Sequence, residues 1–353
     1  MNLLKEKFSD IKNFLKKKKL DAIILFNIGN FIDPNIQYFT NFKPIAGLTN
    51  CIFLLTKEIE DCKLFLSEEI GKVKTNVEII WTKKFKLKEI LSSFKFKRIG
   101  VNKYKIPAKL LEKLKRILKC GIIDVNKFLL EIRSVKVKDE IKIIKKVTKL
   151  TNKCIKQIEN RFSEFKNENE ISDFIDNFAK SNNLKLAFPT IAASGKRSSL
   201  IHPVIKKRIE FAGYIDFGFD LNGYKTDVTI PFIKKKTREV EKFAEILLES
   251  YEIALENLRV GNMSSNIYKK VEDFLKKHGF GLRHALGHGL GLEVHELPSF
   301  DSKSKYFLKN GNVFTIEPGI YVKTFGLRIE DDFLLWKNKL IPLTQSFLLD
   351  LTQ

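Results

Sequence analysis

Three of the chain's five histidines lie in one glycine-rich stretch, His284 to Pro298, which reads HALGHGLGLEVHELP. Gly287, Gly289 and Gly291 disfavour a helix here, because a glycine costs roughly 1 kcal/mol in a helix interior relative to alanine. We therefore expect a bent, extended segment in which backbone and imidazoles crowd around one point. Histidines clustered with acidic residues are typical of metal centres and catalytic sites.

Acidic residues on neighbouring segments complete a possible metal centre with His288. They are Asp216, Asp227, Glu317 and Glu330, of which the two aspartates lie on apolar strand-like segments. Four carboxylates in one interior site would repel one another strongly unless cations neutralised them. Two divalent ions would balance the four negative charges, which favours a dinuclear site. Carboxylates with one imidazole suit Mn²⁺, with Co²⁺, Fe²⁺ or Zn²⁺ as alternatives.

Taken one at a time, these residues also have plain structural interpretations. A buried aspartate is usually a hydrogen-bonded structural residue, and a lone histidine is usually part of a core. The glycine run does not show the strand, turn and helix order of a phosphate-binding loop. His284 and His288 are spaced as in a zinc-binding helix, but the glycines and the missing glutamate argue against one. The metal-site prediction therefore depends on the joint pattern.

The C-terminal region shows two helices followed by strands, twice over. The first set comprises helices at 139–161 and 167–180 and strands at 187–193, 214–219 and 225–232. The second set comprises helices at 237–258 and 264–277 and strands at 313–316 and 327–335. Asn167 and Glu170 have the spacing of a capping box at a helix start. The repetition predicts a pseudo-duplicated α+β domain with a site between its halves.

Residues 1–127 alternate strand and helix patterns, which is typical of an α/β domain. The predicted elements are helices at 8–18 and 108–118 and strands at 21–26, 51–55, 63–66, 77–81 and 98–101. This region contains no chemical motif. We place the second domain at 128–353.

Composition limits the class of protein. The 353 residues suffice for two cores, and 44% hydrophobic with 30% charged residues is typical of a globular chain. The net charge of +22 suggests nucleic-acid binding. However, the lysines are spread along the chain, and runs such as 16–19 and 234–236 lack interleaved aromatic residues, so we interpret them as solvated surface.

The cysteines and the N-terminus indicate a cellular compartment. Cys51, Cys62, Cys120 and Cys154 form no Cys-x-x-Cys pair, which argues against a disulfide framework and a zinc knuckle and fits a reducing cytoplasm. The N-terminus lacks the apolar core of a signal peptide, and no apolar run approaches membrane-spanning length. We expect neither export nor membrane insertion.

The segments that carry the candidate ligands resemble the peptidase family of methionine aminopeptidase, Xaa-Pro aminopeptidase and Xaa-Pro dipeptidase (prolidase), which has the pita-bread fold. The segments are YIDFG around Asp216, TDVT around Asp227, the histidine stretch, FTIEPG around Glu317 and GLRIE around Glu330. The resemblance covers about residues 133–350. The N-terminal domain is similar to the creatinase-type domain that precedes it in the Xaa-Pro enzymes, and Asn35 to Phe42 matches a segment of that domain.

The resemblance implies a role for each site residue. The implied metal ligands are Asp216, Asp227, His288, Glu317 and Glu330. The implied catalytic residues are His202, His295 and Glu317, and the implied substrate contacts are His202, His284 and His295. Arg328 would hold the carboxylates in place, and Thr229 would lie beside the metals. In such enzymes two cations activate a water and polarise the scissile carbonyl, Glu317 would take the proton, and His202 and His295 would stabilise the developing charge.

The histidine pattern and the separate N-terminal domain favour an Xaa-Pro enzyme over methionine aminopeptidase. Some Xaa-Pro dipeptidases bind the dipeptide carboxylate with an arginine directly after the motif's proline, whereas this chain has Ser299. We therefore expect an Xaa-Pro aminopeptidase, acting on peptides with proline at position two, and keep the Xaa-Pro dipeptidase as the alternative. A non-catalytic protein-binding or nucleic-acid-binding relative and a metal-free creatinase-type hydrolase are further alternatives. By resemblance, we expect a homodimer.

Overall fold

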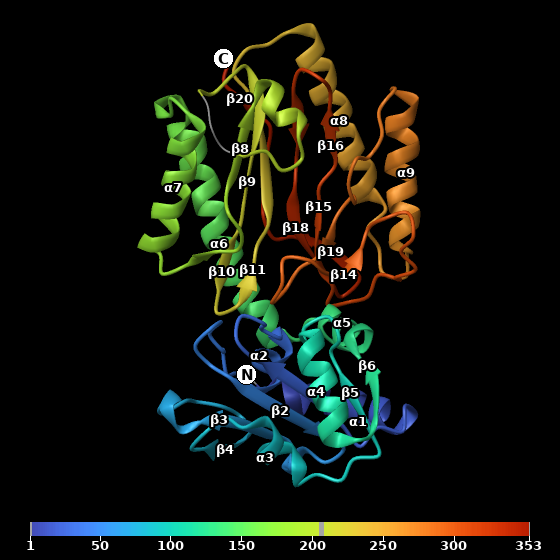
Figure 1. Ribbon diagram of the computed structural model, residues 1–353. Coiled ribbons are helices and arrows are strands. Elements are labelled where there is room, and N and C mark those ends of the chain that lie inside the picture. The colour runs from blue at the N-terminus through green and yellow to red at the C-terminus, as the bar shows by residue number, and fades with distance from the viewer. Residues whose placement is uncertain (1, 205–207, 353) are drawn as a thin grey trace. The chain divides into compact units, whose positions relative to one another are not determined.

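The computed structural model describes residues 2–204 and 208–352 (Figure 1). The chain divides into two compact units: unit 1 ends at Ile132 and unit 2 begins at Arg133. Within the described residues, no helix has both the length and the apolar character needed to cross a membrane.

Unit 1 is built on a six-stranded mixed sheet in the order β4-β3-β2-β1-β5-β6. Its strands are β1 (Ala22–Asn27), β2 (Cys51–Thr56), β3 (Lys63–Ser67), β4 (Glu78–Thr82), β5 (Arg98–Val101) and β6 (Gly121–Asp124). Its helices are α1 (Leu3–Lys17), α2 (Pro34–Thr40), α3 (Leu87–Ser92) and α4 (Ala108–Leu118), and α5 (Asn126–Ser134) follows. Every residue of the central strand β1 is buried, which explains the apolar run from Ala22 to Phe26. The predicted α/β class of this region is confirmed.

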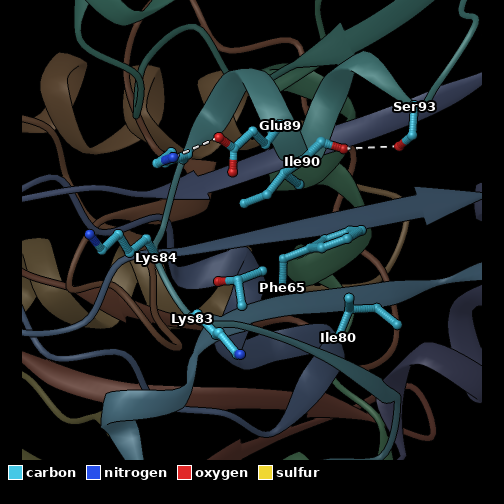
Figure 2. Close-up of a pocket in the computed structure, with 9 residues that line it drawn as sticks. Phe65, Ile80, Lys83, Lys84, Glu89, Ile90 and Ser93 are labelled. Carbon is cyan, nitrogen blue, oxygen red and sulfur yellow. Dashed lines mark hydrogen bonds and ion pairs between the residues drawn. The ribbon is translucent and has the colours of Figure 1, made fainter.

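A cavity of about 570 Å³ opens on unit 1 (Figure 2). Its lining residues are Phe65, Ile80, Thr82, Lys83, Lys84, Lys86, Glu89, Ile90 and Ser93. Lys83 and Lys84 are exposed, and Lys86 pairs with Glu89 at 2.7 Å. None of the site residues predicted from the sequence lines this cavity.

The first half of unit 2 packs two helices against a four-stranded sheet in the order β20-β12-β9-β8. The elements are α6 (Lys138–Arg161), α7 (Glu168–Ser181), β7 (Lys185–Leu186), β8 (Ile191–Ser194), β9 (Ala212–Phe217), β10 (Phe219–Leu221), β11 (Tyr224–Lys225) and β12 (Val228–Ile233). Asn167 caps α7 by accepting a hydrogen bond from the Glu170 amide at 3.1 Å. The Glu170 carboxylate accepts hydrogen bonds from the Lys166 backbone amide at 2.7 Å and from the Asn167 side-chain amide at 2.8 Å, in place of the Asn167 backbone amide that a capping box would use.

The second half repeats this plan with a five-stranded sheet in the order β14-β13-β15-β18-β19. Its elements are α8 (Arg238–Glu256), α9 (Ser264–Lys277), β13 (His288–Gly289), β14 (Glu296–Ser299), β15 (Val313–Ile316), β16 (Gly319–Tyr321), β17 (Gly326–Arg328), β18 (Asp331–Trp336) and β19 (Lys339–Pro342). The last strand, β20 (Leu349–Asp350), returns to the first sheet beside β12. Figure 1 shows α6 and α7 beside the first sheet and α8 and α9 beside the second. Each half has its own apolar core. The predicted pseudo-duplicated α+β architecture is confirmed.

The structure corrects several of the predicted strands. The strand expected at 187–193 begins only at Ile191. The long strands expected at 214–219, 225–232 and 327–335 are each interrupted. At Gly218 the reason is close packing, because a Cβ there would lie 1.9 Å from the carbonyl oxygen of Thr226. These interruptions leave Asp227 and Glu330 between strands. Their side chains therefore need not follow the alternation between the two faces that a regular strand imposes.

Candidate metal centre

Three neighbouring strand segments align Asp216, Thr229 and Glu330 across unit 2. Asp216 on β9 pairs in register with Thr229 on β12. Thr229 in turn forms a two-way backbone bridge with Glu330, with N···O distances of 3.2 and 3.1 Å. The Thr229 hydroxyl also donates to the Glu330 carboxylate at 2.7 Å. This bridge brings the two halves of the unit together at the predicted site.

The histidine stretch reaches the same place through close backbone packing. His288 begins β13, and its amide donates to the Thr315 hydroxyl at 3.2 Å. A Cβ at Gly287 would lie 2.1 Å from the Thr315 carbonyl oxygen, and one at Gly289 would lie 2.1 Å from that of Leu297. Only glycine permits these approaches, so the expectation of a bent, crowded segment is confirmed.

The side chains of three predicted ligands meet in one buried group. One ligand atom from each of Asp227, His288 and Glu330 lies within 4.8 Å of the other two. Glu317 lies beside them, since its Oε1 is 3.5 Å from Nε2 of His288, which is also 3.5 Å from Oδ2 of Asp227. Asp216 joins this group through Arg328, which pairs with Asp216 and donates to the Thr229 hydroxyl at 3.1 Å.

Burial and mutual repulsion disfavour charge on these carboxylates. Burial, followed by the charges of Glu330 and Asp216, raises the pKa of Asp227 well above its ordinary value. Burial and the charge of Glu330 do the same to Glu317. Burial, with the charge of Asp216 next, raises the pKa of Glu330 to about 8. The pKa of Asp216 is also raised by burial, although the charge of Arg328 opposes this. One guanidinium does not offset the charge of three buried carboxylates and the partly buried Glu317.

The donor set fits divalent cations. The Oδ1 atom of Asp216 is buried and has no hydrogen-bond partner within residues 2–204 and 208–352. Nδ1 of His288 lies 3.2 Å from the Gly289 carbonyl, to which it donates, so that Nε2 keeps its lone pair toward Asp227 and Glu317. Burial, with the charge of His295 next, lowers the pKa of His288 to about 3, and the imidazole is therefore neutral, as a ligand must be. Several carboxylate oxygens with one imidazole form a site for a hard or borderline cation.

A hydrogen-bonded chain leads from Arg328 to His284. Arg328 donates to the Tyr321 hydroxyl at 3.1 Å, and this hydroxyl lies 2.9 Å from Nε2 of His284. Nδ1 of His284 lies 2.8 Å from the Ala285 carbonyl and 3.5 Å from the Glu317 carboxylate. Burial, with the Arg328 charge next, lowers the pKa of His284 to about 4. Nδ1–H therefore donates to the carbonyl, and Nε2 accepts from Tyr321.

The remaining predicted site residues, His202 and His295, are exposed. The ring centroids of His295 and His288 are 4.2 Å apart. Burial lowers the pKa of His295, and the charge of His202 lowers it further. His295 therefore lies against the buried group, and the charge of His202 acts on both His295 and Asp216. His278, which we interpreted as a helix cap, is the C-cap of α9.

Two side chains that the sequence did not single out contact the predicted site residues. Tyr321 links Arg328 to His284, and one Asp332 oxygen accepts from the Asp227 amide at 3.3 Å. The sequence carries a signal for Asp332, because in the strand expected at 327–335 it would share a face with Glu330. It carries none for Tyr321, whose neighbours come from distant segments.

Comparison with known proteins identifies the class. The model of metallopeptidase family M24 matches residues 142–336, and that of the creatinase/prolidase N-terminal domain matches residues 8–135. Together with the buried carboxylates, these matches define a two-domain metallopeptidase. The chain belongs to metallopeptidase family M24 and combines the pita-bread fold with a creatinase-type N-terminal domain, which confirms the family, fold and metallopeptidase activity expected from the sequence.

Individual relatives cover nearly the whole chain. An Xaa-Pro dipeptidase of Pyrococcus horikoshii is 32% identical over 98% of this chain and 99% of the relative. The crystal structure of the prolidase from Pyrococcus horikoshii OT3 superposes with a TM-score of 0.86 at 31% identity, covering 97% of this chain and 99% of that one. An X-Pro aminopeptidase structure from Thermotoga maritima has a TM-score of 0.84 at 26% identity, with 97% and 99% covered. Both Pyrococcus horikoshii matches are named for the dipeptidase activity that the sequence analysis kept as its alternative.

Proposed function

We propose that this metallopeptidase is an Xaa-Pro dipeptidase, which hydrolyses the bond between the first residue and proline in dipeptides. The observation that carries the hydrolytic chemistry is the group of three buried carboxylates and the partly buried Glu317 carboxylate beside a neutral imidazole. The choice of dipeptides is supported by the full-length similarity to the Pyrococcus horikoshii Xaa-Pro dipeptidase. This choice reverses the order of preference that Ser299 suggested.

The proposed ligands are Asp216, Asp227, His288, Glu317 and Glu330, holding two divalent ions, of which Mn²⁺ fits the oxygen-rich set best. Bound divalent cations would supply an activated water and a Lewis acid for the scissile carbonyl. We extend the proposal to a homodimer and to the cytoplasm, on the family resemblance and the reducing environment that four free cysteines suit. Sedimentation velocity would test the dimer.

The chain's own residues then have separate tasks. Glu317 accepts the proton released when the carbonyl is attacked, since its carboxylate lies next to His288. His202 and His295 are exposed imidazoles at the edge of the buried group, where they can donate to the carbonyl oxygen as charge develops on it. Arg328 holds Asp216 and Thr229, and thereby keeps the carboxylate group in one arrangement.

A second candidate is the Xaa-Pro aminopeptidase, which releases the first residue from longer peptides. Ser299 favours it, because its hydroxyl donates to Asp301 at 2.5 Å and supplies no positive charge for a dipeptide's terminal carboxylate. The similarity to the Thermotoga maritima X-Pro aminopeptidase structure is consistent with it.

The test is hydrolysis of Ala-Pro and Ala-Pro-Ala by the full chain, stripped of metal and reconstituted with Mn²⁺, Co²⁺, Fe²⁺ or Zn²⁺ in turn. We expect metal-dependent release of alanine, with the dipeptide as the better substrate by kcat/KM, and much slower hydrolysis of Ala-Ala. Preference for the tripeptide would replace the dipeptidase with the aminopeptidase. No hydrolysis with any of the four metals would refute both.

A further inference from the structure

Hydrogen bonds join several residues of a short backbone segment, Ser198 to His202, to residues around the candidate metal centre. We call it the His202 segment. The Ser198 hydroxyl accepts from the Gly326 amide at 2.9 Å, and the Ser199 carbonyl accepts from Arg283 at 2.9 Å. A Cβ at Gly326 would lie 2.1 Å from the Ser198 carbonyl oxygen. The segment is therefore packed directly against β17.

Arg328 donates to the Ile201 carbonyl at 3.4 Å, and Tyr214 bonds both of the residues before His202. The Tyr214 hydroxyl donates to the Leu200 carbonyl at 2.5 Å and lies 3.1 Å from the Ile201 carbonyl. Tyr214 is fully buried on β9, two residues before Asp216, so both side chains leave the same face of the strand. The His202 side chain is itself exposed. Its position consequently depends on how the preceding backbone is held.

The ring and the hydroxyl of Tyr214 make different contacts. The Arg328 guanidinium packs over the ring, with Cζ 4.5 Å from its centroid, and pairs with Asp216. The hydroxyl, in contrast, bonds the two carbonyls of the His202 segment and also lies within hydrogen-bonding reach of Arg328. Removing the oxygen alone would leave the ring packed on Arg328 and the Ile201 carbonyl bonded to Arg328, whereas the Leu200 carbonyl would lose the bond from Tyr214. The backbone before His202 would then be held by fewer hydrogen bonds.

We propose that Tyr214 is a positioning residue: its hydroxyl fixes the backbone immediately before His202 and so sets where this imidazole stands relative to the carboxylate group. The effect on catalysis rests on the proposed function. The positioning itself does not, because it follows from contacts that are present without substrate.

The test compares the full-length protein with Tyr214→Phe by NMR of ¹⁵N-labelled imidazoles, with the His202 signal assigned by its loss in His202→Gln. We expect the His202 signal to shift or broaden in Tyr214→Phe while the signals of His278 and His288 stay in place. With Mn²⁺ added, we expect kcat/KM on Ala-Pro to fall about fivefold, the order of effect of one lost hydrogen bond, and bound Mn²⁺ to remain as in the wild type.

Tyr306→Phe is the matched control, because it also removes a hydroxyl with two partners, Ser134 and Asn312, outside the His202 segment. It should leave the His202 signal unchanged. The inference is overturned if Tyr214→Phe also leaves this signal unchanged, if all histidine signals move together, or if bound Mn²⁺ falls with activity. A shifted His202 signal in a protein with no peptidase activity would uphold the positioning and refute the proposed function instead.

Discussion

Two buried acidic sites in unit 2 differ in whether the chain's own cations balance their negative charge. Glu296, within the histidine stretch, is 6% exposed, similar to Asp227 in the candidate metal centre at 5%. Burial would raise the pKa of Glu296, but the charges of Arg133 and Lys136 outweigh it and hold this pKa below its ordinary value. Both cations lie 3.1 Å from the Glu296 carboxylate.

The carboxylates of the candidate metal centre have no such balance. Asp216 pairs with Arg328, whereas the pKa of Asp227 is raised well above its ordinary value by burial and by neighbouring carboxylates. The chain can therefore satisfy a buried acid with its own cations, as it does at Glu296. The comparison indicates that the missing charge at the centre is supplied from outside, by metal ions.

The largest effect should come from removing one proposed ligand. Asp227→Asn keeps the size of the side chain but removes a negative oxygen, and we expect kcat/KM on Ala-Pro to fall roughly a thousandfold, about 4 kcal/mol of transition-state stabilisation. Steady-state kinetics with saturating Mn²⁺ measure this. Asp273→Asn, on the exposed face of α9, is the control and should retain full activity. An Asp227→Asn enzyme within tenfold of the wild type would mean that Asp227 is not a ligand.

Breaking the balanced site should cost folding stability. Glu296→Gln leaves the charge of Lys136 buried without its partner, and we expect a loss of about 3 kcal/mol in the free energy of unfolding of unit 2. Urea denaturation measures it. Glu164→Gln breaks an exposed pair with Arg161 and should cost less than about 0.5 kcal/mol. Equal losses in the free energy of unfolding for the two variants would show that the buried pair stabilises the fold no more than the exposed pair does.

The pH dependence of the metal-free chain should have a definite sign. The pKa of Glu330 is raised from 4.5 to about 8, so the folded state holds a proton that the unfolded state has already lost. Stability should therefore fall as pH rises from 6.5 to 8.5. The lowered pKa values of His284 and His288 act in the opposite direction, but mainly below pH 6.5, the ordinary value at which these side chains lose their proton in the unfolded chain. Calorimetry should show a decreasing Tm, and Mn²⁺ should raise Tm more at pH 8.5 than at 6.5. A rising Tm in the metal-free chain would contradict this.

The smallest effect is expected for Asp227→Asn in the absence of metal. Because Asp227 is repelled by Glu330 and Asp216, Asp227→Asn should stabilise the metal-free chain, raising its Tm by about 2–4 °C, on the order of 1 kcal/mol. The variant that destroys activity would thus be the more stable protein. Thermal unfolding in the presence of a chelator measures this, and a lower Tm than the wild type would show that repulsion does not dominate at this position.

Much of the fold could be predicted from periodicity, and the exceptions have physical reasons. The long helices α6 and α8 were placed to within two residues of their ends, because many turns repeat the same apolar face. The short helices α2 and α3 were missed, since six or seven residues hold too little periodicity to distinguish them from loops. The breaks around Asp227 and Glu330 were missed as well, because they depend on packing with distant segments.

The candidate site was predictable to the extent that its chemistry lies in residue types. Acidic residues on apolar segments and a glycine-rich histidine stretch signalled the buried group, while the link from Arg328 through Tyr321 to His284 required the fold. The balanced pairing of Glu296 with Arg133 and Lys136 was also invisible in the sequence, because these residues lie 160 positions or more apart.

The most direct test of the central claim is equilibrium dialysis of the full chain against Mn²⁺, with the bound metal counted per chain. We predict two ions per chain for the wild type, fewer for Glu330→Gln, and no change for Glu296→Gln refolded under stabilising conditions. No retained Mn²⁺, or the same number retained by the wild type and Glu330→Gln, would contradict the claim that divalent cations hold these carboxylates together.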